Sequence, residues 1–169
     1  VVEVISEQSN VLILSSFLHP DIGALKKSIE SNKQRKVTLM RSTDTYKLEE
    51  YQTVVLYQPT NSFQKVFAEL KSQKINYFII TGSKTDWNFL NIAQDNFEKK
   101  AINQTENYGP IFNPIFGGFV VDDIGVDTFS PLVDKFGEVT FNIPFETLLY
   151  QKIGNFASEQ PLLATFDEN

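Results

Sequence analysis

The fold is decided by one stretch, Tyr77-Phe78-Ile79-Ile80-Thr81-Gly82-Ser83-Lys84-Thr85-Asp86-Trp87. Its first five residues are aromatic or β-branched, which is typical of a buried strand, and the run stops at Gly82. Residues that begin helices follow at once, so a strand leads directly into a helix N-terminus. Ligands of open α/β sheets bind where strands end in this way. The stretch therefore predicts a class of fold and the place of a site.

The residues before this stretch repeat the alternation of strand and helix. Apolar runs predict four strands, at residues 11–14, 37–40, 53–57 and 77–81. Apolar residues three and four positions apart predict helices at about 20–31, 63–70 and 87–97. Helices between strands require crossover connections. We therefore expect an α/β fold with a doubly wound, mostly parallel sheet of the flavodoxin-like type.

The last third of the chain has a different character. Turn-forming Gly and Pro residues mixed with aromatics predict irregular chain over residues 108–118, followed by a strand near 119–121. Alternating patterns predict a strand at 139–143 and a terminal pair at 147–153 and 162–166. We expect the C-terminal third to add antiparallel strands to one edge of the parallel sheet.

The length of 169 residues fits one α/β domain spanning residues 1–169, because two domains would each be small. The chain begins at Val1 without an initiator Met, so we expect a piece excised from a longer membrane protein. It holds no run of about 18 apolar residues, so this piece is not expected to span a membrane itself.

Charge and composition exclude several functions. A net charge of -6 opposes binding to nucleic acid, so no nucleic-acid partner is expected. The absence of Cys excludes thiol catalysis, thiolate metal sites and disulfides. A single His and the turn-like spacing of Asp122, Asp123 and Asp127 predict no metal site. No glycine-rich nucleotide motif follows the first strand, and we expect no cofactor.

The predicted ligand-binding residues gather at the carboxyl ends of the strands, and they are Thr81, Gly82, Ser83, Lys84, Thr85 and His19. Hydroxyls, an ammonium and free amides at a helix N-terminus could hold a phosphate or carboxylate. The simpler interpretation is that Thr85 or Asp86 caps the helix. His19 precedes Pro20 and Asp21, so it is either an oriented general base or a helix cap.

Four segments resemble the amidotransferase-like domain of large bacterial membrane-anchored proteins related to the von Willebrand factor A group, namely Val11–Leu14, His19–Leu25, Tyr77–Asn88 and Leu148–Gly154. The order of elements is similar to the class I glutamine amidotransferase-like fold. The resemblance implies a domain attached to the membrane through its parent protein and lying in the extracytoplasmic, periplasmic space. It also implies partners among other domains of the same polypeptide or proteins of a membrane complex.

Members of the amidotransferase class place a nucleophilic Cys on the turn after this strand, with His and Glu later in the chain. The matching turn here is Thr81-Gly82-Ser83, and no His follows residue 19. Without the thiolate and its proton acceptor the triad is absent. We therefore expect no catalytic residues, and a domain for ligand recognition or for protein–protein and interdomain contact. The alternatives are a hydrolase or acyl transferase using Ser83 or Thr81 with His19, and a small-anion binder at the Thr81–Asp86 turn.

Overall fold

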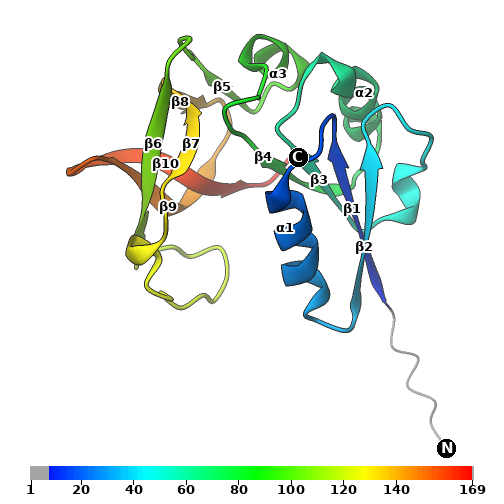
Figure 1. The fold of residues 1–169 in the computed structure, drawn as a ribbon, viewed down its shortest axis with the longest axis horizontal. Coiled ribbons are helices and arrows are strands. Elements are labelled where there is room, and N and C mark those ends of the chain that lie inside the picture. Colours follow the sequence, from blue (N-terminus) through cyan, green and yellow to red (C-terminus); the bar gives the residue numbers. More distant parts are fainter. Residues whose placement is uncertain (1–7, 169) are drawn as a thin grey trace, which may run out of the picture. The chain divides into compact units, whose positions relative to one another are not determined.

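A computed structural model describes residues 8–168 of the chain. The chain divides into two compact units, Val1–Asp86 and Trp87–Asn169 (Figure 1). Each unit has its own sheet and is described by itself. The prediction that residues 1–169 form one domain stays a prediction.

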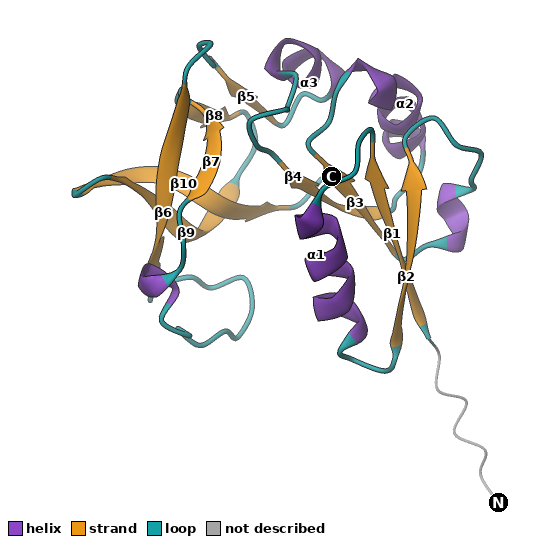
Figure 2. Cartoon of the chain, in the orientation of Figure 1, coloured by secondary structure: helices purple, strands orange, loops and turns teal. Residues whose placement is uncertain are grey.

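The first unit is built on a parallel sheet whose strand order is β2-β1-β3-β4. Its strands are β1 (Ser9–Ser15), β2 (Arg35–Arg41), β3 (Thr53–Tyr57) and β4 (Asn76–Ile80). Its helices are α1 (Pro20–Glu30), α2 (Gln64–Ser72) and the 3-10 turns η1 (Leu48–Glu50) and η2 (Asn61–Phe63), shown in purple in Figure 2. All neighbouring strands run parallel, as predicted from the alternation of strands with helices.

The central strand β1 is buried on both faces, which explains its unbroken apolar sequence. Val11 and Ile13 belong to a cluster with Ile22 of α1. Leu12 and Leu14 point to the opposite face, because side chains alternate along a strand, and both are 0% exposed. Full burial of such a Leu stabilises the fold by about 1.5–3 kcal/mol. Burial on both faces therefore stabilises the central strand whose carboxyl end leads to the candidate site.

The second unit contains one helix, α3 (Trp87–Ala93), among its described residues. Its main sheet is antiparallel and curled, with strand order β10-β9-β6-β7, and a separate pair joins β5 and β8. The strands are β5 (Phe97–Lys99), β6 (Thr105–Phe112), β7 (Leu132–Lys135), β8 (Val139–Phe141), β9 (Phe145–Ile153) and β10 (Phe156–Phe166), and the 3-10 turn is η3 (Val126–Thr128).

The predicted doubly wound fold of flavodoxin-like or class I glutamine amidotransferase-like type is wrong. The parallel sheet stops at four strands, and the C-terminal strands do not extend its edge. They pair with one another instead, since β6 lies between β7 and β9. The general α/β character remains.

Two local predictions in this half are also wrong. Residues 105–112 form the strand β6 despite Gly109 and Pro110, because pairing with β9 outweighs the local turn signal. Residues 119–121 form no strand, and Val120 is fully exposed. The terminal pair of strands is confirmed as β9 and β10, which run antiparallel.

None of the helices within residues 8–168 has the length and apolar character needed to cross a membrane.

Candidate functional site

The carboxyl ends of β1 and β3 lie side by side in the first unit, where Ser15 is paired with Tyr57. From β1 the chain crosses to β2 on one side, and from β3 it crosses to β4 on the other. In open α/β sheets, ligands bind at the carboxyl ends of the strands near such a reversal of direction. The candidate site is therefore the loops that follow β1, β2, β3 and β4.

His19, Asp21 and Tyr57 form a hydrogen-bonded cluster at this edge. The Tyr57 hydroxyl lies 3.0 Å from His19 Nδ1 and 3.1 Å from Asp21 Oδ2. His19 is the N-cap of α1, and its Nδ1 accepts a hydrogen bond from the Asp21 amide at 3.3 Å. Burial raises the pKa of Tyr57, so the hydroxyl stays protonated and serves as a donor. The cluster fixes the start of α1, and His19 has the role of a cap.

The cluster does not include the hydroxyls that the hydrolase hypothesis requires. His19 makes its hydrogen bonds with Asp21 and Tyr57, and its ring contacts with Phe17 and Tyr57. A general base must lie within about 3 Å of the proton that it abstracts. No hydrogen bond joins His19 to Ser83 or Thr81 in the part of the chain that the structure describes.

The turn after β4 uses its amides within the protein. The Gly82 amide donates to Thr85 Oγ1 at 2.9 Å, and the Thr85 amide donates to the Gly82 carbonyl at 2.9 Å. The Lys84 amide donates to Gln58 Oε1 at 2.8 Å, and the Asp86 amide donates to the Pro59 carbonyl at 3.0 Å. These four amides are therefore not free to hold an anion.

The side chains of this turn differ in exposure. Thr85 is 0% exposed and closes the turn from inside, whereas Ser83 is half-buried and Lys84 is exposed. The Thr85 hydroxyl accepts from the Gly82 amide within the turn. The side chains of Ser83 and Lys84 are thus accessible to a ligand.

A hollow of about 190 Å³ lies at the ends of β1 and β2, beside the start of α1. Apolar side chains from three elements line it, and polar side chains of the strand ends join them; the lining includes Ile13, Phe17, Ile22, Leu39, Ser15, Ser16, Arg41 and Asp44. Ile13 and Leu39 are paired across β1 and β2, and the next pair on this face is Ser15 with Arg41. The hollow therefore combines an apolar interior with a polar end.

Among the residues that the structure describes, Arg41 is the only one with a cationic side chain that lines this hollow. Its backbone amide donates to Asp44 Oδ2 at 2.8 Å, which fixes the turn after β2. Its guanidinium makes no hydrogen bond or ion pair with any residue between 8 and 168. An unengaged guanidinium is a strong donor for a carboxylate or phosphate.

Sequence reasoning missed Arg41 and the hollow. A signal was present, because Arg41 directly follows the predicted strand 37–40 and must therefore lie at the same sheet edge as His19. The sequence signal is stronger at the turn after residue 81, which holds several hydroxyls and Gly82. The structure brings Arg41, Asp44 and Ser15 together from two parallel neighbours.

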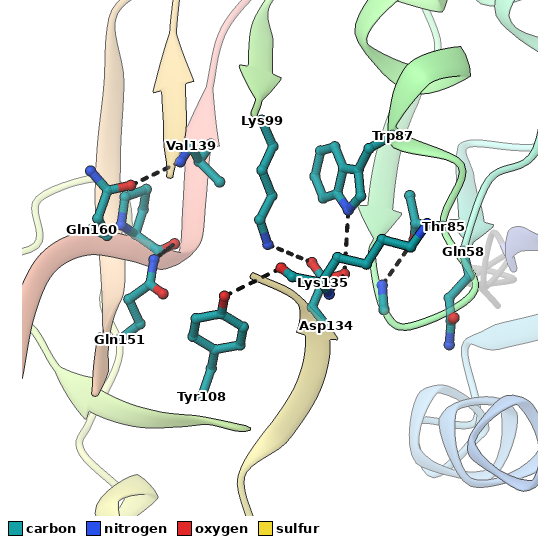
Figure 3. Close-up of polar contacts among 12 residues, drawn as sticks. Gln58, Thr85, Trp87, Lys99, Tyr108, Asp134, Lys135, Val139, Gln151 and Gln160 are labelled. Carbon is teal, nitrogen blue, oxygen red and sulfur yellow. Dashed lines mark hydrogen bonds and ion pairs between the residues drawn. The ribbon is translucent and has the colours of Figure 1, made fainter. Parts of the chain in front are cut away.

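A second cluster of polar side chains is buried in the other unit (Figure 3). Lys99 Nζ lies 2.9 Å from Asp134 Oδ2, and Trp87 Nε1 donates to Asp134 Oδ1 at 3.3 Å. The ammonium lies 5.1 Å from the ring centroids of Trp87 and Tyr108. Burial raises the pKa of Tyr108, whose hydroxyl donates to the Lys135 carbonyl at 3.3 Å. The cluster is closed and internally paired, which fits a structural role.

The acidic turn at Asp122, Asp123 and Asp127 is organised by its own backbone. Asp123 Oδ1 accepts from the amides of Gly125 at 2.9 Å and Val126 at 3.3 Å. No group of three or more His, Asp or Glu side chains within residues 8–168 is arranged to hold a metal ion.

Comparison with known proteins adds no relative. No family model, curated protein or solved structure matches this chain. The resemblance to the amidotransferase-like domain of membrane-anchored bacterial proteins thus stays a prediction.

Proposed function

We propose that this chain is a non-catalytic recognition domain that binds a small anionic molecule in the hollow at the ends of β1 and β2. The observation that carries the proposal is the Arg41 guanidinium, which has no partner among residues 8–168 and lines an apolar hollow. A carboxylate or phosphate on the ligand would pair with it through two parallel hydrogen bonds.

The size and lining of the hollow limit the ligand. Drug-sized ligands occupy pockets of about 300–1,000 Å³, and this hollow holds about 190 Å³. Apolar side chains such as Ile13 and Leu39 suit a short aliphatic or aromatic body. A small carboxylic acid with one apolar group fits both features, and a large nucleotide does not.

The arrangement of the polar groups favours recognition over catalysis. His19 caps α1 and shares its Nδ1 with Asp21 and Tyr57, so it is not oriented toward a nucleophilic hydroxyl. The raised pKa of Tyr57 opposes its use as a base. The placement of the domain outside the cytoplasm, in a membrane-anchored parent protein, is part of this proposal and rests on the resemblance alone.

The experiment is a calorimetric titration with short aliphatic and aromatic carboxylates and with inorganic phosphate. We expect one carboxylate class to bind the wild type, and Arg41→Ala to weaken it about ten- to a hundredfold, because a hydrogen bond to a charged group is lost. Arg35→Ala is the matched control, since Arg35 begins the strand that Arg41 ends and is exposed.

The outcomes separate the candidate sites. Loss of binding in Ser83→Ala or Lys84→Ala, with Arg41→Ala unaffected, would move the anion site to the turn after β4. Equal loss in Arg35→Ala and Arg41→Ala would mean attraction to net positive charge rather than a site. If no probe binds the wild type, the hollow is not a site for small anions.

A further inference from the structure

The segment between β6 and β7 in the second unit, residues 113–131, carries large apolar side chains into solvent. Figure 1 shows it as a wide loop that extends away from these strands. Ile115 is 85% exposed, Val120 100%, Ile124 73% and Phe129 53%. Leu132, directly after the segment, is 60% exposed. A concentration of exposed large apolar side chains in one loop is typical of interaction surfaces.

The loop is held by specific contacts at its base. The amide of Asn113 donates to the Leu148 carbonyl at 3.0 Å, and its Nδ2 donates to the Thr147 carbonyl at 2.6 Å. Asp123 accepts two backbone hydrogen bonds at the start of η3, and Val126 is buried. The backbone is therefore shaped by its own hydrogen bonds while the apolar side chains remain outside.

The charges within the loop restrict its partner. Residues 113–133 hold three carboxylates, from Asp122, Asp123 and Asp127, and no Lys or Arg. All three acidic residues are exposed. Anionic lipid headgroups would repel them, and insertion beside Val120 would carry Asp122 toward the hydrocarbon. A protein surface with apolar side chains beside Lys and Arg complements both features.

We propose that residues 113–131 are a docking surface for a cationic amphipathic segment of a partner protein. The apolar side chains of the loop would bury those of the partner, and its carboxylates would pair with the partner's Lys or Arg. This site belongs to the second unit and is independent of the hollow at Arg41.

The test uses two synthetic helical peptides with the same Leu face, one with Lys and Arg on the polar face and the other with Glu. Fluorescence anisotropy measures their binding to the full chain at about 0.05 M and about 0.5 M salt. We expect the cationic peptide to bind at least about tenfold more tightly than the acidic one, and binding to weaken as salt rises.

Variants separate a docking surface from general attraction to an acidic protein. Val120→Ser with Ile124→Ser should weaken the cationic peptide about tenfold or more, because the apolar part of the surface is lost. The control is Ile92→Ser, since Ile92 is 81% exposed on α3 of the same unit. Asp122→Asn with Asp127→Asn should reduce the salt dependence. Circular dichroism and the Tm confirm that each variant is folded.

Four outcomes would overturn the proposal. In the first, the two peptides bind equally tightly, and in the second, Ile92→Ser weakens binding as much as the loop variant does. In the third, the chain binds neutral lipid vesicles and this binding requires Val120 and Ile124. In the fourth, the chain self-associates in a concentration-dependent way and the loop variant does not. The third would assign the loop to a membrane surface and the fourth to a second copy of this chain.

Discussion

The ammonium of Lys99 lies 2.9 Å from Oδ2 of Asp134, and the two side chains are only 5% and 11% exposed. The indole of Trp87 donates to the other carboxylate oxygen, and the Lys135 amide donates to that same oxygen at 2.7 Å. The pair thus joins β5, β7 and the start of α3 inside the second unit. The free-energy cost of removing both charges from water offsets most of the attraction in such a buried pair. Removing one partner is strongly destabilising, because the other charge then stays buried without a counter-ion.

We predict that Asp134→Ala destabilises the protein by about 3–5 kcal/mol, because it leaves a buried ammonium without its counter-ion. Urea denaturation measures the change. Glu138→Gln is the control, because Glu138 is an exposed carboxylate of the same unit. Replacing both partners, as Lys99→Met with Asp134→Asn, should recover much of the loss, since Asn can still accept from Trp87. A double variant as unstable as Asp134→Ala would show that the ion pair is not the cause.

Gly82 supports a second prediction, because its backbone approaches another side chain closely. A Cβ added at Gly82 would lie 2.7 Å from Cδ of Gln58. The Gln58 side chain can move away only by losing the hydrogen bond that its Oε1 accepts from the Lys84 amide. Gly82→Ala should therefore destabilise the protein by about 1–3 kcal/mol through overpacking.

Gly23→Ala is the matched control for that change. Nothing lies within 4 Å of a Cβ added at Gly23, which is exposed in α1. It should stabilise the protein by about 0.5–1 kcal/mol, because Ala favours a helix. Both changes are measured by urea denaturation, and a neutral Gly82→Ala would contradict the close approach.

The parallel half of the fold could be predicted from the sequence, and the antiparallel half could not. Strands β1 and β3 are continuous apolar runs that are buried on both faces, and such runs are visible in a local window. Strand β6 holds Gly109 and Pro110, which resemble a turn locally. These residues form a strand because they pair with β9, about forty residues further along the chain. A local sequence pattern cannot predict such a distant pairing.

The predicted site residues and the hollow at Arg41 lie at the same sheet edge, and the site itself stays a prediction. Hydroxyls and amides of the turn after β4 gave a strong local signal, yet Thr85 and Gln58 occupy the amides of Gly82 and Lys84. The hollow at Arg41 arises where two strands separated in sequence end together. Such a site depends on the register of the two strands and on the space that the surrounding side chains leave empty. A local sequence motif specifies neither of these.

Thr85 gives a third prediction, for the turn itself. Its hydroxyl is buried and accepts from the buried amide of Gly82. Thr85→Val keeps the shape but leaves that amide unsatisfied, which should cost about 1–3 kcal/mol. Ser83→Ala is the control, because Ser83 is two residues away and its hydroxyl makes no hydrogen bond with the residues described. Equal effects of the two changes on urea denaturation would contradict the assigned role of Thr85.

The last prediction concerns pH and the end of α1. A hydrogen bond from the Val37 amide at 3.0 Å, and then the ammonium of Lys26 at 3.0 Å, hold the pKa of Glu30 below its ordinary value of 4.5. A carboxylate whose pKa is lowered by folding stabilises the protein above its ordinary pKa, and this contribution is lost as the pH falls through the lowered pKa. Glu30→Gln should therefore lower the Tm at about pH 7 more than at about pH 3.

Comparing the effect of Glu30→Gln on the Tm at the two pH values tests the charge of the Glu30 side chain. The size and shape of the side chain hardly change, because Gln keeps an oxygen that can accept a hydrogen bond from the Val37 amide. Glu49→Gln, at an exposed carboxylate in η1, controls for the general loss of one negative charge. If the Tm difference between wild type and Glu30→Gln is the same at both pH values, the ionised carboxylate does not join α1 to β2. A difference that closes at low pH would show that this contact contributes to the acid sensitivity of the first unit.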